Sequence, residues 1–140
     1  MKYLVALAII LFANIEFGYA WPSVPSAQGL DNPPAMHCEQ ANCRSCWEGQ
    51  RQNAEAFRRS CENFRLQCEG FKGAVETGRV RFESERRNSM ITSEKYQEEF
   101  GHYVDLIMTY QQILENYYRG IQIYKELGAA YQQGVKVCQY

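Results

Sequence analysis

Apolar residues recur every seven positions along two long stretches of the chain, with alternating spacings of three and four that keep one helix face toward a partner. In the first stretch the two seam positions hold Trp47, Ala54, Cys61, Cys68, Val75 and Phe82, and Cys43, Phe57, Phe64, Phe71 and Gly78. In the second they hold Tyr96, Tyr103, Tyr110, Tyr117, Tyr124 and Tyr131, and Phe100, Ile107, Leu114, Ile121, Gly128 and Val135. The pattern predicts helices over about 43–87 and about 93–138.

Only residues 88–92 separate the two predicted helices, and so short a connection joins antiparallel neighbours. A turn centred near Met90 pairs residues whose numbers sum to about 181. This register sets Phe64 against Tyr117 and Ala54 against Gly128, so large layers alternate with small ones. We expect the tyrosine rings to fill the seam and their hydroxyls to reach water at its edge. A slip by one heptad is the alternative register.

Beside the first seam runs a row of alternating charges with the same period. Its members are Arg44, Arg51, Arg58, Arg65, Lys72, Arg79 and Arg86, and Glu48, Glu55, Glu62, Glu69, Glu76 and Glu83. Such pairs stabilise an exposed helix by ~0.2–0.5 kcal/mol each, while each glycine inside a helix costs about 1 kcal/mol relative to alanine. Because the charge row passes without a break through Gly49, Gly70, Gly73 and Gly78, one continuous helix is predicted, with Ser93 as the N-cap of the second.

The residues before the helices divide into two segments. Residues 1–20 have Lys2, an apolar run and the ending Gly18-Tyr19-Ala20, which together predict a signal peptide. Residues 21–37 contain all four prolines and no periodic apolar pattern, which predicts a flexible arm. The hairpin domain then covers 38–140. No later stretch reaches the ~20 apolar residues that a bilayer requires, so we expect secretion without membrane insertion.

All six cysteines follow the predicted signal peptide, and an even number in an exported chain indicates disulfides. The register favours a bond from Cys43 to Cys138, whose numbers sum to 181, with Cys46 as the alternative partner of Cys138. Cys38 is then close enough to Cys46 for a local bond. Cys61 and Cys68 lie seven residues apart, roughly 10 Å along a helix, and cannot bond to each other. A break in the helix, buried free thiols, or bonds across a dimer are the remaining alternatives.

The chain offers no set of residues from which an enzyme mechanism can be built. The Cys43-Arg44-Ser45-Cys46 spacing resembles a redox motif but lacks the strand pattern on which that chemistry relies. Cysteines held in disulfides cannot join His37 in a zinc site, and we expect His102 on the surface. The net charge of −1 gives no field that would attract nucleic acid. We therefore expect no catalysis, cofactor or metal.

These observations favour an all-α, disulfide-stapled coiled-coil hairpin that acts as a secreted protein-interaction factor, such as a component of reproductive, salivary or venom fluid. A self-assembling structural protein and an extracellular carrier of a small apolar ligand are the alternatives. Leu106, Ile113 and Leu127 on one flank, and Met108 and Tyr118 elsewhere, extend the apolar surface of the second helix beyond its seam, which favours a homodimer arranged as a four-helix bundle. The pair Arg86-Arg87, at the predicted tip, is a candidate site for proteolytic processing.

Overall fold

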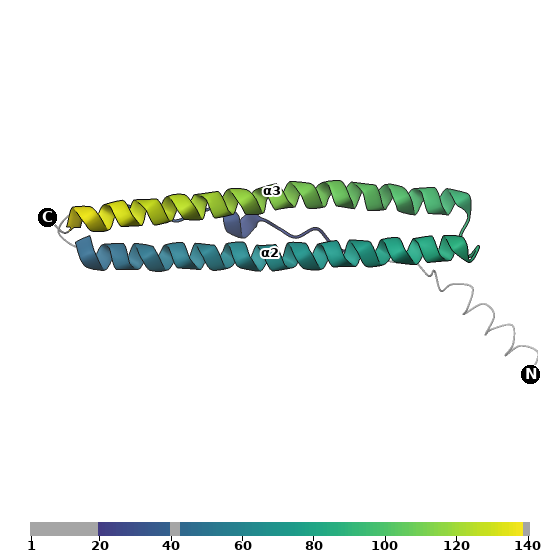
Figure 1. Ribbon diagram of the computed structural model, residues 1–140, viewed down its shortest axis with the longest axis horizontal. Helices are drawn as coiled ribbons and strands as arrows, with labels where there is room; N and C mark the ends of the chain where they lie inside the picture. Colours follow the sequence, from purple (N-terminus) through teal and green to yellow (C-terminus); the bar gives the residue numbers. More distant parts are fainter. Residues whose placement is uncertain (1–19, 40–42, 139–140) are drawn as a thin grey trace, which may run out of the picture.

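The computed structural model describes residues 20–39 and 43–138. Two long helices, α2 (Cys43–Arg87) and α3 (Ser93–Cys138), lie side by side and antiparallel, and a short 3₁₀ turn, η1 (Gln28–Leu30), lies against them (Figure 1). The predicted all-α hairpin is confirmed, and α2 continues through its four glycines. The predicted signal peptide lies outside the described residues except for Ala20. No helix in the described ranges has the length and apolar content to cross a bilayer.

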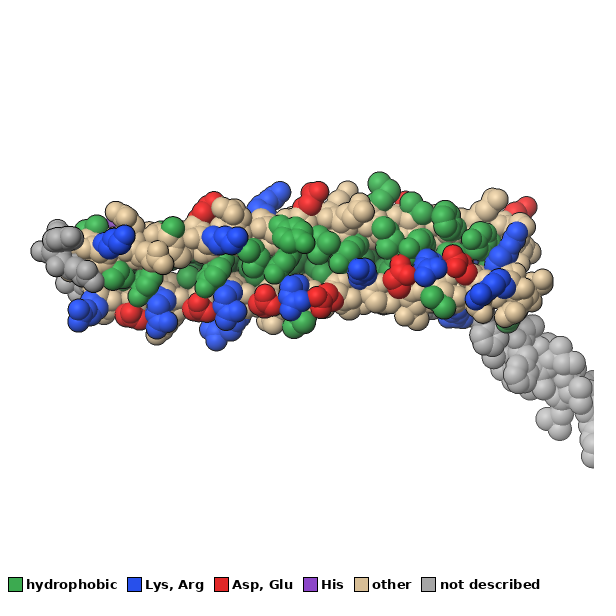
Figure 2. Space-filling model, in the orientation of Figure 1, with side chains coloured by type: hydrophobic (Ala, Val, Ile, Leu, Met, Phe, Trp, Pro, Cys, Tyr) green, Lys and Arg blue, Asp and Glu red, His purple; other side chains and the backbone are tan. Residues whose placement is uncertain are grey.

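The face that α2 presents to the interior is the predicted one. Its buried residues are Ala54, Phe57, Cys61, Phe64, Cys68, Phe71, Val75, Gly78 and Phe82. One edge of this face carries the charge ladder, visible as alternating blue and red side chains along the lower helix in Figure 2. Within the ladder, Arg51, Arg58, Arg65 and Arg79 pair with glutamates three or four residues away, as in Glu62–Arg65 at 3.1 Å and Arg65–Glu69 at 2.6 Å.

The inner face of α3 is rotated relative to the sequence-based prediction. Its buried residues form a different row with the same period, Ile113, Gly120, Leu127 and Gly134, while the tyrosines are half-buried along one edge. Phe100, placed in the seam by the heptad pattern, is 45% exposed. The prediction of a tyrosine-centred seam was therefore wrong in detail. Gly120 lets Cys61 of α2 and Leu30 of η1 approach the α3 backbone, and Gly134 does the same for Trp47 of α2.

The arm lies along the hairpin, contrary to the flexible segment that its prolines predicted. Leu30 in η1 is 7% exposed and packs in the core with Cys61, and Met36 and Trp21 also contact that core. The Trp21 indole packs edge-on against Phe82 with ring centroids 6.1 Å apart, and its Nε1 donates a hydrogen bond to Glu99 at 2.8 Å. Isolated apolar side chains thus anchor a segment that has no periodic pattern.

The arm also covers the apolar flank of α3 that favoured a dimer. Ile113 and Leu127 are only 6% and 8% exposed within a single chain. This flank therefore gives no reason for a second hairpin to pack on the first, and the homodimer stays a prediction without that support.

The connection between the helices is closed by backbone hydrogen bonds. At the end of α2, Met90 N donates to Glu85 O at 2.8 Å and Ser89 N to Arg86 O at 3.1 Å, the pattern of a Schellman C-cap. Ser89 takes the left-handed conformation that this cap requires, with φ of 55°. At the start of α3, Thr92 Oγ1 accepts a hydrogen bond from Lys95 N at 3.1 Å. Thr92, not the predicted Ser93, is thus the N-cap.

Candidate functional site

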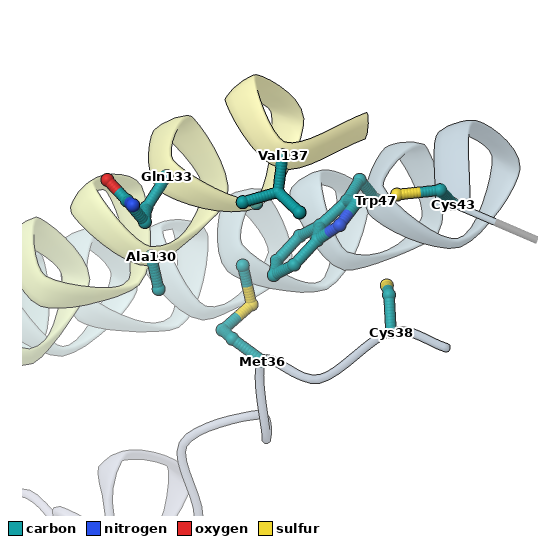
Figure 3. A pocket seen from close by; sticks show the side chains of 8 residues that line it. Met36, Cys38, Cys43, Trp47, Ala130, Gln133 and Val137 are labelled. Carbon is teal, nitrogen blue, oxygen red and sulfur yellow. The ribbon is translucent and has the colours of Figure 1, made fainter. Parts of the chain in front are cut away.

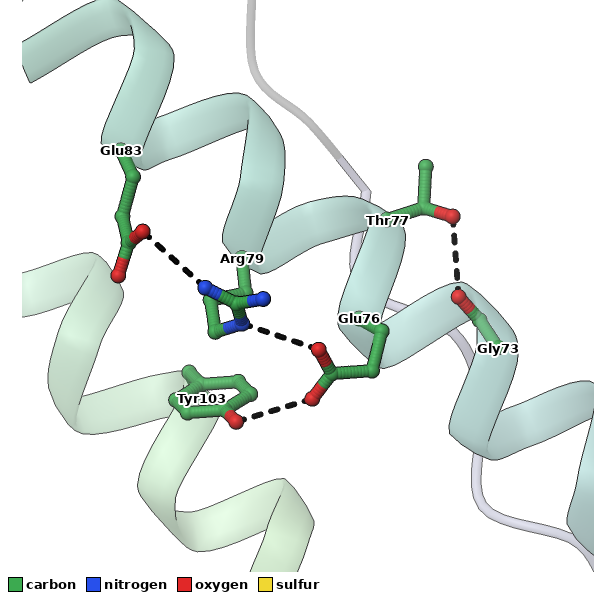
Figure 4. A network of polar contacts seen from close by, with 6 residues as sticks. All are labelled: Gly73, Glu76, Thr77, Arg79, Glu83 and Tyr103. Atoms are coloured by element: carbon green, nitrogen blue, oxygen red, sulfur yellow. Dashed lines mark hydrogen bonds and ion pairs between the residues drawn. The ribbon is translucent and has the colours of Figure 1, made fainter.

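The rim tyrosines of α3 bond to the charge ladder of α2. Tyr103, Tyr124 and Tyr131 each donate a hydroxyl hydrogen bond across the interface, to Glu76 at 3.0 Å, Glu55 at 2.9 Å and Glu48 at 3.2 Å. Figure 4 shows one such bridge, in which Glu76 accepts from both Tyr103 and Arg79, and Arg79 also contacts Glu83. These hydroxyls lie at the edge of the interface, where the carboxylates that accept from them are 39–50% exposed. Both rows repeat every seven residues, so their pairing at a constant sum of 179 could have been found from the sequence.

The electrostatics of this rim are those of paired surface ions. Hydrogen bonds from Arg58 and then from Tyr124 hold the pKa of Glu55 below its ordinary value. Arg79 and Tyr103 lower the pKa of Glu76 in the same way, whereas desolvation raises the pKa of Tyr103. A carboxyl group that acts as a general acid at neutral pH needs a raised pKa. The bridges favour the ionised form of these carboxylates, and in that form each carboxylate can accept the tyrosine hydrogen bond that joins α2 to α3.

The cysteines are arranged at one end and in the middle of the hairpin. Cys43 is bonded to Cys138 with a Cα–Cα distance of 5.8 Å, the pair that the register predicts, and Cys38 is bonded to Cys46. Cys61 and Cys68 are free thiols with no exposed surface. Burial raises the pKa of both thiols, which disfavours the reactive thiolate. Of the three alternatives, this arrangement is that of buried free thiols in an unbroken helix, and a bond across a dimer would require them to leave the core.

A cavity of about 430 Å³ lies at the disulfide-bonded end, between the arm and both helices (Figure 3). Its walls are Met36 and Cys38 of the arm, Cys43 and Trp47 of α2, and Ala130, Gln133, Gly134 and Val137 of α3. The Trp47 ring packs against Tyr131 with centroids 6.4 Å apart and lies so close to Gly134 that a Cβ there would overlap it. The heptad pattern predicts only a seam position for Trp47 and does not indicate this cavity, because the arm had no predicted position.

The candidate processing site lies at the exposed C-terminal end of α2, where Arg86 and Arg87 form its last turn. The Arg86 guanidinium lies 5.2 Å from the centre of the Tyr96 ring and donates to Ser93 Oγ at 2.7 Å. A protease would have to unwind this turn and break both contacts, and cleavage stays a prediction.

The two histidines are both exposed and lie in different parts of the fold, His37 in the arm and His102 on α3. Among the residues that the structure describes, no three His, Cys, Asp or Glu side chains converge as metal ligands. Cys38, Cys43, Cys46 and Cys138 are bonded in pairs, and the absence of a metal site stays a prediction.

No family model, no curated protein and no solved structure matches this chain.

Proposed function

We propose that the protein acts outside the cell, without catalysis, by binding an extracellular protein through the outward face of α3. Two disulfides support an oxidising location, because such bonds persist outside the cytosol. The lowered carboxyl pKa values support a non-catalytic role, since these groups are committed to ion pairs.

The observation that carries the proposal is a stripe of exposed large apolar side chains on α3. Phe100, Val104 and Met108 are 45%, 38% and 57% exposed and follow one another at intervals of four residues. Each interval turns only about 40° around an α-helix, so the three share one face. Tyr118, 64% exposed, returns to the angular position of Phe100 after five helical turns. An apolar stripe of this kind marks a contact with another protein more often than scattered single residues do.

The partner we infer presents an amphipathic helix. A ridge of side chains at four-residue spacing fits the groove between equivalent ridges of another helix. The outer face of α2 is unlike this stripe, because its exposed apolar residues Leu66 and Val80, 56% and 54% exposed, lie 14 residues apart. The contact is therefore assigned to α3.

Site-specific photo-cross-linking followed by affinity measurement tests this assignment. A benzophenone amino acid at Val104, exposed to extracellular fluid of the source organism, is expected to give a discrete adduct that the same probe at Leu66 does not give. The double variant Phe100→Ser/Met108→Ser should then weaken binding of the purified partner at least tenfold. The matched variant Leu66→Ser/Val80→Ser, with equally exposed positions on α2, should leave the affinity unchanged.

The proposal fails if both double variants bind the partner equally, or if neither probe position gives an adduct. Adducts formed only between copies of this chain would support the self-assembling alternative. Analytical ultracentrifugation separates that outcome further, because a structural protein would form open-ended polymers and an interaction factor a discrete small species.

A further inference from the structure

We propose that the cavity at the disulfide-bonded end binds a small, neutral, largely hydrocarbon molecule that contains a ring and at most one polar group. This site is separate from the α3 stripe and does not depend on the proposed partner. It also differs from the seam, which is filled along its length by the core side chains of both helices.

The size and lining of the cavity define this ligand. Its volume of about 430 Å³ falls in the range of ~300–1,000 Å³ that is typical of small-molecule sites. The Trp47 indole, the Met36 thioether and the Val137 side chain supply apolar walls, and none of the described residues in the lining carries a charge. A charged ligand would lose its hydration without gaining a counter-charge, which excludes ions as good occupants. Among the described lining residues, the Gln133 amide and the Trp47 indole N–H can hydrogen-bond a polar group of the ligand.

The cavity is held open by covalent bonds on two sides. The Cys38–Cys46 bond fixes the arm to α2 beside Met36, and the Cys43–Cys138 bond fixes α2 to α3. Gly134 leaves room for the Trp47 ring, which Tyr131 contacts from another side. Because the three walls are already joined, a ligand need not order them on binding, and this lowers the cost of association. No comparable bonds hold the remainder of the arm.

Fluorescence titration of the oxidised protein with N-phenyl-1-naphthylamine, a neutral aromatic probe, tests the proposal. The chain has two tryptophans, so a Trp21→Phe background leaves Trp47 as the sole indole. We expect saturable binding of one probe per chain, with rising probe emission and energy transfer from Trp47. In the same background, Ala130→Leu should fill the cavity and weaken binding at least tenfold.

The matched control is Ala129→Leu, the same change at the neighbouring exposed position outside the cavity, and it should bind the probe as the background does. Val137→Phe, at a position 56% exposed, narrows the same space without disturbing the core and should reproduce the loss seen with Ala130→Leu. Circular dichroism verifies that each variant keeps its helices. Binding that is non-saturable, that is absent, or that is equally strong in the blocked and control variants would overturn the proposal.

Discussion

Two glycines of α3 lie where side chains of α2 and of η1 approach its backbone. A Cβ on Gly120 would lie 3.0 Å from Cys61 Sγ and 3.4 Å from a Leu30 methyl group, and a Cβ on Gly134 would overlap the Trp47 ring. Leu30 of the arm therefore packs against Gly120, and the Trp47 indole packs against Gly134. At the residue scale, the lack of a side chain at Gly120 and Gly134 therefore matters to the packing as much as the large side chains that approach them.

Gly134→Ala should lower the free energy of unfolding by about 1–3 kcal/mol, because the Trp47 ring must move to admit the new methyl group. Gly128→Ala is the matched control on the same helix. No atom lies within 4 Å of a Cβ there, so the gain in helix propensity should stabilise by up to about 1 kcal/mol. Urea denaturation measures both changes, and equal midpoints for the two variants would contradict this packing.

The thiols of Cys61 and Cys68 should be inert in the folded protein. Both are fully buried, and burial raises their pKa values, so neither access nor thiolate favours reaction. A colorimetric thiol reagent should titrate none of the cysteines in the native state and two per chain after unfolding in urea. Rapid reaction before unfolding, or no reaction after it, would show that these thiols are exposed or bonded.

At the scale of the elements, the helices could be predicted from the sequence and the arm could not. The limits of α2 and α3 follow from heptads, the unbroken charge ladder and a turn too short for anything but a reversal. The arm is held by single side chains, such as Leu30 and Trp21, whose contacts lie on helices far away in the sequence. No periodic pattern in the sequence predicts such contacts. The cavity beneath the arm could not be predicted either, because the arm forms one of its walls.

Leu30→Ala should lower the free energy of unfolding by about 2–3 kcal/mol, because it removes a nearly buried side chain from the core. Val24→Ala, in the same arm but 46% exposed, should change stability by less than about 0.5 kcal/mol. Chemical denaturation compares the two variants. If they unfold at the same denaturant concentration, the arm does not pack as described.

The tyrosine bridges predict that the hairpin loses stability in acid. The native pKa values of Glu48, Glu55 and Glu76 lie below the ordinary value of about 4.5, so the unfolded chain binds more protons as the pH falls past that value. Their stabilising effect is complete above this pH and is lost as the pH falls through the native pKa values.

The triple variant Tyr103→Phe/Tyr124→Phe/Tyr131→Phe isolates this effect. It removes the hydroxyl contribution but leaves the arginines, the larger cause of the lowered pKa values. Its urea midpoint should fall less steeply on acidification than that of the original protein. If the urea midpoints of the variant and of the original protein depend on pH in the same way, the tyrosine bridges do not contribute to the stability.

The whole molecule is a rod closed at both ends, by the Schellman turn at one and by the Cys43–Cys138 bond at the other. A cross-link over a separation of 95 residues stabilises by ~4–5 kcal/mol in the chain-entropy model. This bond could be predicted because its numbers sum to the value that the layer sizes had already indicated. For Cys61 and Cys68 the sequence left three alternatives open. Their burial depends on the position of the arm, which the sequence did not predict.

The most direct test of the stapled antiparallel hairpin is a disulfide map of the unreduced protein cut with trypsin and a glutamate-specific protease. Cleavage after Glu39 and Arg44 separates Cys38, Cys43 and Cys46 onto different peptides. We expect peptide 40–44 to be bonded to the peptide that carries Cys138. The peptide that ends at Glu39 should be bonded to the one that carries Cys46, and Cys61 and Cys68 should carry free thiols. A bond from Cys138 to Cys61 or Cys68 would contradict the register, and with it the hairpin described above.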